Sequence, residues 1–245
     1  METRAESTAL WARTGAIALP LGVILLVVAT AVHPSREDVM NHEAVFREYA
    51  LSDGWIAIHF TQWVAGLVFF GGLVALYVAM TAKREGPTAL ARFGVTAMVL
   101  TAAAITMLQA VDGVALKWAV DAWVDAPADK EPSTFAAAMA LRWTEYALQS
   151  YSNILLGLTL IFFGLAIAYG NAYSRWPGWL AAGSGVAWIV HGLMVSYVGL
   201  FDSAPRGVAL VLMAAWAFVM AVLMWRSGGR GHAARAAAPA GPLTA

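Results

Sequence analysis

The sequence contains no cysteine in 245 residues. Disulfide bonds, thiolate metal sites, a cysteine nucleophile and thioether-linked haem are therefore excluded. Charged residues are also scarce, because they make up 12% of the chain where soluble domains have roughly 25%. The formal net charge is zero and no basic run is present that could follow a phosphate backbone, so no nucleic-acid partner is expected.

Long apolar segments dominate what is present. Hydrophobic residues account for 60% of the chain, and its mean hydropathy is +0.67. A helix that crosses the hydrocarbon core of a bilayer needs about 20 mostly apolar residues. Six segments reach that length: 15–32, 56–80, 93–116, 146–169, 179–200 and 208–225. The sequence therefore predicts an all-α integral membrane protein, a bundle of six transmembrane helices, with the lipid bilayer as its partner.

The basic residues indicate which way this bundle faces. The N-terminus, residues 81–92, residues 170–178 and the C-terminal tail together hold nine basic and three acidic residues. The segments on the other side hold six basic and twelve acidic residues. Because cytoplasmic loops are enriched in lysine and arginine, the first side is predicted to be cytoplasmic. Both termini are then cytoplasmic in a multi-pass protein of the cell membrane.

Residues 1–226 are interpreted as a single six-helix domain, and residues 227–245 as a disordered cytoplasmic tail rich in Gly, Ala, Pro and Arg. The first span has a second interpretation. Arg4 and Arg13 precede an apolar run that ends near Ala31, a pattern that is also typical of a cleaved signal peptide. The apolar run is as long as a spanning helix, and this length favours a retained span.

Residues 33–53 are predicted to form a lid on the outer face, built on a short amphipathic helix. Phe46 and Ala50 fall on one helical face, and Pro34 with Asp38 forms a helix-start pattern. The third and fourth apolar patterns also continue past the bilayer on this side, which predicts two long helices that project from it. Any site is therefore expected to open outward, beneath the lid.

Small residues recur at helical spacing in the fourth and fifth spans, at Gly157, Gly164, Gly178, Ala181, Ala182 and Gly185. Lipid provides no hydrophobic drive between helices, and small residues let helix backbones approach closely. The pattern predicts that these two spans pack tightly on each other.

Polar residues in the outer parts of the spans form the candidate ligand-binding set: His59, Gln109, Asp112, Lys117, Arg142, Glu145, Gln149, Asn153 and His191. An ionisable residue within a membrane span is costly to bury, so each is a functional hypothesis. Gln109 and Asp112 share one face of the third helix, and the polar residues of the fourth helix share another. The set predicts a polar pocket in the outer-leaflet half of the bundle.

Two interpretations of this set stay open. In the structural one, Asp112 pairs with Arg142 between neighbouring helices, and His191 is a neutral imidazole bonded to an adjacent helix. In the functional one, Asp112, Glu145 and His191 are candidates for acid–base catalysis. Arg142 and Lys117 would then hold an anionic group of the ligand.

No metal site is predicted. Asp121, Asp125 and Asp129 recur at four-residue spacing, but Pro127 interrupts the run and no second acidic stretch complements it. Histidines and other carboxylates of the outer side show no ligand spacing on a single element.

The cofactor stays unidentified. A haem held between His59 and His191 is conceivable, although the two residues differ in depth. Retinal is excluded because none of the three lysines, Lys83, Lys117 and Lys130, lies in the middle of the membrane.

Three functions stay open from the sequence, which leaves unspecified both the oligomeric state and whether the protein is an enzyme. The first is binding or conversion of a small lipid-soluble ligand in the polar pocket. The second is a structural, assembly or partner-binding role without catalysis. The third is small-molecule transport, which usually requires a path of polar groups at the midplane and internal repeats that this sequence does not display.

Overall fold

The computed structural model describes residues 4–82, 88–200 and 203–236, and within these ranges it is entirely helical. Its elements are α1 (Arg4–Ala31), α2 (His42–Ala50), α3 (Trp55–Thr81), α4 (Thr88–Ala110), the π-helical turn η1 (Val111–Leu116), α5 (Lys117–Val124), α6 (Glu131–Ala168), α7 (Trp176–Val198) and α8 (Ala204–Ala236). Six helices are long and apolar enough to cross a membrane, with α4, η1 and α5 forming one continuous span. The prediction of a six-helix membrane bundle agrees with this arrangement.

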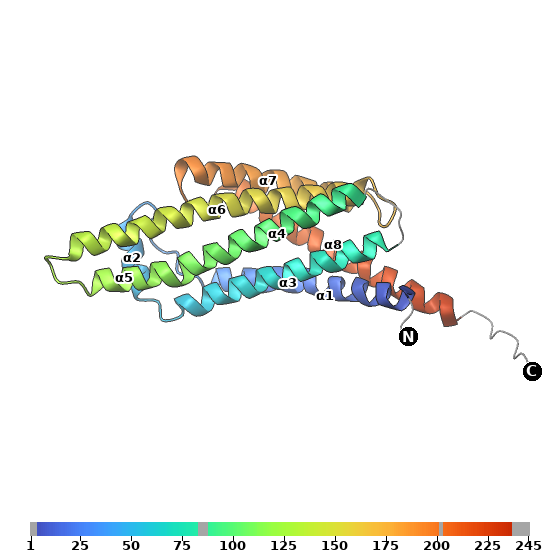
Figure 1. The fold of residues 1–245 in the computed structure, drawn as a ribbon, viewed down its shortest axis with the longest axis horizontal. Helices are drawn as coiled ribbons and strands as arrows, with labels where there is room; N and C mark the ends of the chain where they lie inside the picture. Colours follow the sequence, from blue (N-terminus) through green and yellow to red (C-terminus); the bar gives the residue numbers. More distant parts are fainter. Residues whose placement is uncertain (1–3, 83–87, 201–202, 237–245) are drawn as a thin grey trace, which may run out of the picture.

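The six spans form a closed ring in which each packs against two neighbours. The order around the ring is α1, α3, α4, α6, α7 and α8, and α8 returns to α1. The spans run roughly along the long axis of the molecule, and α2 lies at the end where α5 meets the start of α6 (Figure 1). We call this the α2 end; α1 begins at the opposite end.

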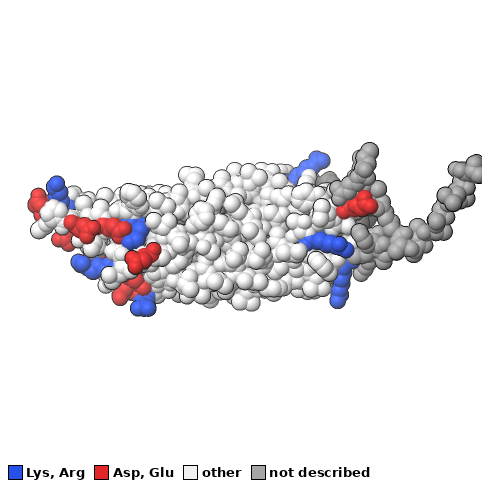
Figure 2. Space-filling view, turned by 90° about the horizontal axis from the view of Figure 1, so that it is seen from below, with Lys and Arg blue, Asp and Glu red and all other residues white. Residues whose placement is uncertain are grey.

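The charged side chains gather at the two ends of the bundle. In Figure 2 a broad white band separates the α2 end, where most visible acidic groups lie, from an opposite end with mainly basic groups. The uneven distribution of charge along the sequence therefore corresponds to two ends of the bundle that differ in charge. The white band is what a lipid-facing surface requires, since a charged group in hydrocarbon is costly.

The lid contains the predicted amphipathic helix, but its start was predicted wrongly. The helix α2 begins at His42, and Asn41 caps it by accepting a hydrogen bond from the Ala44 amide on its side-chain oxygen. Pro34 and Asp38 precede the helix in an irregular segment. Asparagine is as good an N-cap residue as those of the expected pattern. The sequence therefore offers two possible helix starts, one at Pro34 and Asp38 and one at Asn41.

The apolar face of α2 packs on the ends of the neighbouring spans. Its buried side chains are Val45, Phe46 and Tyr49. They join a hydrophobic cluster with Trp55, Leu116, Val120, Trp123 and Ala138. The helix is therefore fixed to α3, η1, α5 and α6 by apolar contacts, and this positions the lid over the interior of the ring.

Both long helices were predicted correctly. The third span is a 36-residue stretch and α6 has 38 residues. The end of α8 differs from expectation, since this helix continues to Ala236 although an irregular tail was expected from residue 227. The rest of that predicted tail lies outside the described residues. The first helix packs along α3 and α8.

The small residues of α6 and α7 bring these helices into backbone contact. A Cβ at Gly157 would meet the Gly185 carbonyl oxygen at 2.5 Å, and one at Gly164 would meet the Gly178 carbonyl oxygen at the same distance. Both are closer than real Cβ contacts, so only glycine fits. The predicted close packing is confirmed.

Candidate functional site

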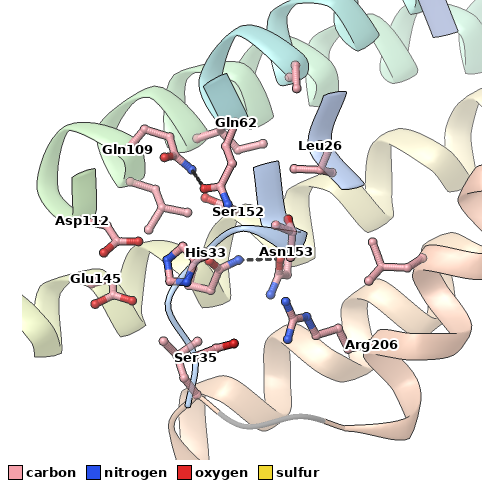
Figure 3. Close-up of a pocket in the computed structure, with 18 of the residues that line it drawn as sticks. Leu26, His33, Ser35, Gln62, Gln109, Asp112, Glu145, Ser152, Asn153 and Arg206 are labelled. Carbon is pink, nitrogen blue, oxygen red and sulfur yellow. Dashed lines mark hydrogen bonds between the residues drawn. The ribbon is translucent and has the colours of Figure 1, made fainter. Parts of the chain in front are cut away.

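A cavity of about 810 Å³ lies in the α2 end of the ring, with residues from all six spans and the lid around it. Its deeper part is apolar, lined by Val23, Phe69, Phe70, Ile105, Leu156 and Met213. Its part nearer α2 is polar, with His33, Gln109, Asp112, Glu145 and Asn153 (Figure 3). Arg142 also lines this part and bonds to Tyr49 of α2. The volume falls in the range of roughly 300–1,000 Å³ that is usual for small-molecule sites.

His59 and Asp112 form a buried pair at the polar end. Nδ1 of His59 lies 2.8 Å from the Trp55 carbonyl oxygen and donates to it, because a carbonyl only accepts. Nε2 of His59 lies 3.0 Å from Oδ2 of Asp112. This second bond needs a second proton, on the imidazole or on the carboxyl group. With either placement the pair as a whole has no net charge.

The π-helical turn holds Asp112 against α3. The Trp55 indole N–H donates to the Asp112 carbonyl oxygen over 3.0 Å. The next residue is Gly113, and a Cβ there would collide with the His59 Cβ. A wider helical turn and a missing side chain therefore bring the two helices together where the pair forms. Such π-helical turns are frequent at functional sites.

Arg142 and Glu145 form a second buried pair on α6. Nη1 of Arg142 donates to Oε2 of Glu145 over 2.8 Å and to the Tyr49 hydroxyl over 3.0 Å. The guanidinium carbon also lies 4.9 Å from the ring centre of Tyr146. Arg142 is 1% exposed and Glu145 is 3% exposed. The charge of Arg142 is thus compensated within the protein and linked to the lid through Tyr49.

The expected pairing of Asp112 with Arg142 was wrong. Asp112 bonds to His59 on α3, and Arg142 bonds to Glu145 three residues further along its own helix. The physical reason is that η1 contacts both α3 and α6. Helical spacing places a residue on a face but does not say which neighbour that face meets.

Two amide pairs line the cavity farther from the α2 end than the charged pairs. The Gln109 side-chain amide donates to the Gln62 oxygen over 3.5 Å, and that of Gln149 donates to the Asn153 oxygen over 2.9 Å (Figure 3). Each pair leaves one buried polar atom without a hydrogen-bonding partner in the described part of the chain, Gln109 Oε1 and Asn153 Nδ2. These are one acceptor and one donor.

Further unpartnered polar atoms belong to other lining residues. Asp112 Oδ1, Ser152 Oγ and Trp188 Nε1 are buried and make no hydrogen bond to the described residues. Ser152 is 2% exposed and Trp188 is 6% exposed. Buried polar groups in proteins are almost always hydrogen-bonded, so a concentration of such atoms around one cavity indicates a place for a polar partner.

His191 is buried on α7 and lines the cavity. Its Nδ1 is 2.9 Å from the hydroxyl oxygen of Ser203, which also accepts the Arg206 backbone amide at the start of α8. Arg206 itself lines the cavity (Figure 3). The imidazole therefore connects α7 to the first turn of α8.

Two lid residues, His33 and Tyr49, have shifted pKa values. Burial lowers the pKa of His33, and the nearby charges of His59 and Arg142 lower it further, while Asp112 opposes them. The His33 ring is 5.1 Å from that of His59 and 4.9 Å from that of Trp55, centre to centre. Burial also raises the pKa of the Tyr49 hydroxyl, which stays a neutral donor and acceptor.

The structure brings most of the predicted site residues together. Seven of the nine line the cavity: Gln109, Asp112, Arg142, Glu145, Gln149, Asn153 and His191. His59 is not among the lining residues, but it forms a hydrogen bond with the lining residue Asp112. Lys117 is not among the lining residues, because its Nζ donates to the Ala50 carbonyl oxygen over 3.1 Å and pairs with Asp121. It holds the end of α2 in place.

Sequence reasoning missed Tyr49, Gln62 and Trp188 as cavity residues. Tyr49 follows Phe46 by three residues on the buried face of α2, and Gln62 follows His59 by three residues on α3. Both spacings were visible in the sequence. Trp188 precedes His191 by three residues on α7, but this spacing alone does not reveal a cavity.

Metal and haem binding each require ligands that converge on one point. Within the described ranges no three His, Asp or Glu side chains converge as metal ligands. Both ring nitrogens of His59 make hydrogen bonds. A haem between His59 and His191 would require breaking the bond to Asp112 or the one to Trp55, so the geometry does not fit it.

Comparison with known proteins adds no assignment. No protein-family model, no curated protein and no solved structure matches this chain.

Proposed function

We propose that this protein is a six-span protein of the cell membrane, with both termini cytoplasmic, that binds a small lipid-soluble amphiphile in its cavity. The observation that carries the proposal is the division of the cavity. Its deeper part is apolar, and its part near α2 contains buried polar atoms that lack partners. An amphiphile has this division, with a tail that replaces lipid and a head that needs hydrogen bonds.

The charge distribution supports an outward location of the cavity. In the sequence, the segments on the side opposite α2 hold nine basic and three acidic residues, and such sides are cytoplasmic in most membrane proteins. The cavity would then lie in the half of the bundle within the outer leaflet. Several residues that line it are also exposed, including Val27 and Thr30 on α1 and Ser35 in the lid. A ligand would enter past these residues.

Two glycines of α3 offer a matched test. Gly66 lines the cavity, and a Cβ there makes only ordinary contacts, with its nearest atom at 3.8 Å. Gly71 does not line it, and a Cβ there meets nothing within 4 Å. Gly66→Leu therefore fills the cavity without a backbone collision, and Gly71→Leu makes the same chemical change elsewhere on the same helix.

The experiment is mass spectrometry of the small molecules that co-purify with each variant in lipid nanodiscs. We expect an amphiphile with the wild type and with Gly71→Leu, and its loss from Gly66→Leu. The proposal fails if no molecule is enriched over empty nanodiscs, or if all three proteins retain it equally. That result would favour the structural role.

A further inference from the structure

We infer that the cavity selects an uncharged amphiphile whose head carries at least one hydrogen-bond donor, such as a hydroxyl group, together with an acceptor. This inference rests on the proposed function and specifies the class of ligand. It follows from the charges around the polar part of the cavity and from the chemistry of the unpartnered atoms there.

The charges in this part compensate one another. Asp112 and His59 share a proton in a pair without net charge, and Arg142 donates to Glu145 over 2.8 Å. Arg206 also lines the cavity, and it too has an interaction partner within the protein. A charged head group at this depth would lose its hydration and would meet only charges that the protein already compensates. The cost of such a buried, unpaired charge is large, so the site disfavours both anions and cations.

At the mouth of the cavity, a carboxylate is bound by backbone amides. There the carboxylate of Glu48 accepts the backbone amides of Arg36 and Glu37 over 3.0–3.3 Å. These bonds hold the lid loop to α2. Glu48 is therefore engaged by the protein itself, and we assign it to the closure of the lid.

The atoms without partners in the described chain are of both kinds. Gln109 Oε1 and Asp112 Oδ1, on the span of α4 and η1, accept hydrogen bonds. Asn153 Nδ2 and Arg142 Nε on α6 and Trp188 Nε1 on α7 donate them, and Ser152 Oγ can do either. Asn153 is 3% exposed and Trp188 is 6% exposed, so bulk water does not reach them freely. A head with only acceptors would leave Gln109 and Asp112 unsatisfied, which carries a desolvation penalty.

Four probes with the same length of tail test the inference: monolaurin, methyl laurate, dodecanesulfonate and dodecyltrimethylammonium. Monolaurin is uncharged with hydroxyl donors and an ester acceptor, and methyl laurate retains only the acceptor. The other two are a permanent anion and a permanent cation. Binding is measured as displacement of radiolabelled monolaurin from the protein in nanodiscs, with empty nanodiscs as the correction for partition into lipid.

We expect monolaurin to bind at least tenfold more tightly than each of the other three. Equal or tighter binding of methyl laurate or of either charged probe would overturn the inference, while leaving the proposed amphiphile site intact. If none of the four probes binds, the inference is overturned. If, in addition, no molecule co-purifies in a Gly66-dependent manner, the proposed function is overturned as well.

Two tryptophans provide a matched pair of variants. The indole N–H groups of Trp188 and Trp216 are both buried without a partner among the described residues, but only Trp188 lines the cavity. Trp188→Phe should weaken monolaurin binding by about threefold to tenfold, the value of one hydrogen bond, and Trp216→Phe should not change it. An equal effect of both substitutions, or no effect of either, contradicts the assignment of Trp188 as a donor to the head group.

Discussion

The imidazole of His59 lies 3.0 Å from the carboxyl group of Asp112, and its other nitrogen donates to the carbonyl oxygen of Trp55. Trp55 in turn donates from its indole to the backbone of Asp112. Two residues of α3 thereby bond to Asp112, the second residue of η1, and the remaining oxygen of Asp112 has no partner in the described part of the chain.

Two substitutions of Asp112 should separate the effect of losing its hydrogen bond to His59 from the effect of losing its carboxyl group. Asp112→Leu leaves His59 Nε2 without a partner, and we expect a loss of about 1–3 kcal/mol in the free energy of unfolding. Asp112→Asn retains a donor for the neutral imidazole and should cost less. Unfolding by sodium dodecyl sulfate in mixed micelles measures both. In the background of His59→Leu, the effect of Asp112→Leu should shrink; additive losses would show that the pair does not interact.

The pair of Arg142 and Glu145 should be strongly sensitive to single truncation. Glu145→Leu leaves a buried guanidinium group uncompensated, with an expected cost of about 3–5 kcal/mol. The double variant Arg142→Met/Glu145→Leu removes both charges and should recover most of this loss in the same unfolding assay. The exposed pair of Arg47 and Glu43 is the control, since Glu43→Ala should cost less than about 0.5 kcal/mol. Equal losses at the two pairs would refute the buried geometry.

Glycines on α7 should respond in opposite directions to the same substitution. A Cβ at Gly185 collides with the Gly157 carbonyl oxygen, so Gly185→Ala should destabilise the bundle by about 1–3 kcal/mol. The nearest atom to a Cβ at Gly183 is 3.8 Å away, so Gly183→Ala gains helix propensity, up to about 1 kcal/mol. Thermal unfolding followed by circular dichroism compares them. A destabilised Gly183→Ala would argue against this packing of α6 and α7.

Acid should open the lid. Burial lowers the pKa of both His33 and His42, so the closed lid binds fewer protons than the open one. Closure is therefore fully favoured above the ordinary histidine pKa of about 6.5 and is weakened as the pH falls below it. Around His33, the charges of His59 and Arg142 oppose protonation and Asp112 favours it. Arg142 also opposes protonation of His42.

Introduced thiols can report this opening because the chain has no cysteine of its own. Val45→Cys is on the buried face of α2, and Leu51→Cys is on an exposed position. The maleimide reactivity of Val45→Cys, divided by that of Leu51→Cys, should rise as the pH falls, by up to about tenfold per pH unit for each histidine. The rise should disappear in His33→Asn/His42→Asn; its persistence there would assign it to other groups.

The orientation in the membrane is also open to thiol labelling. Ala128 and Ser174 are exposed, uncharged residues in loops at the α2 end and at the opposite end. A membrane-impermeant maleimide applied to intact cells should react with Ala128→Cys, whereas Ser174→Cys should react only after permeabilisation. The reverse result would place both termini outside and the cavity in the inner leaflet.

Much of the fold could be predicted from the sequence, because a membrane span needs a fixed length of apolar residues and the chain shows that length six times. The extension of the third and fourth spans could be read in the same way. The start of α2 could not, since Asn41 and the pattern at Pro34 are both acceptable helix starts and only the contacts of Val45 and Phe46 select between them.

The sequence by itself therefore determined the number of spans, the two oppositely charged ends and the set of polar residues near one of them. The tertiary structure alone decided which of these residues meet. Asp112 faces His59 because a π-helical turn and Gly113 bring η1 against α3, and Arg142 meets Tyr49 because the folded chain brings α2 next to α6. Local spacing fixes the face of a helix on which a side chain lies, but the neighbour of that face depends on packing between segments far apart in the chain.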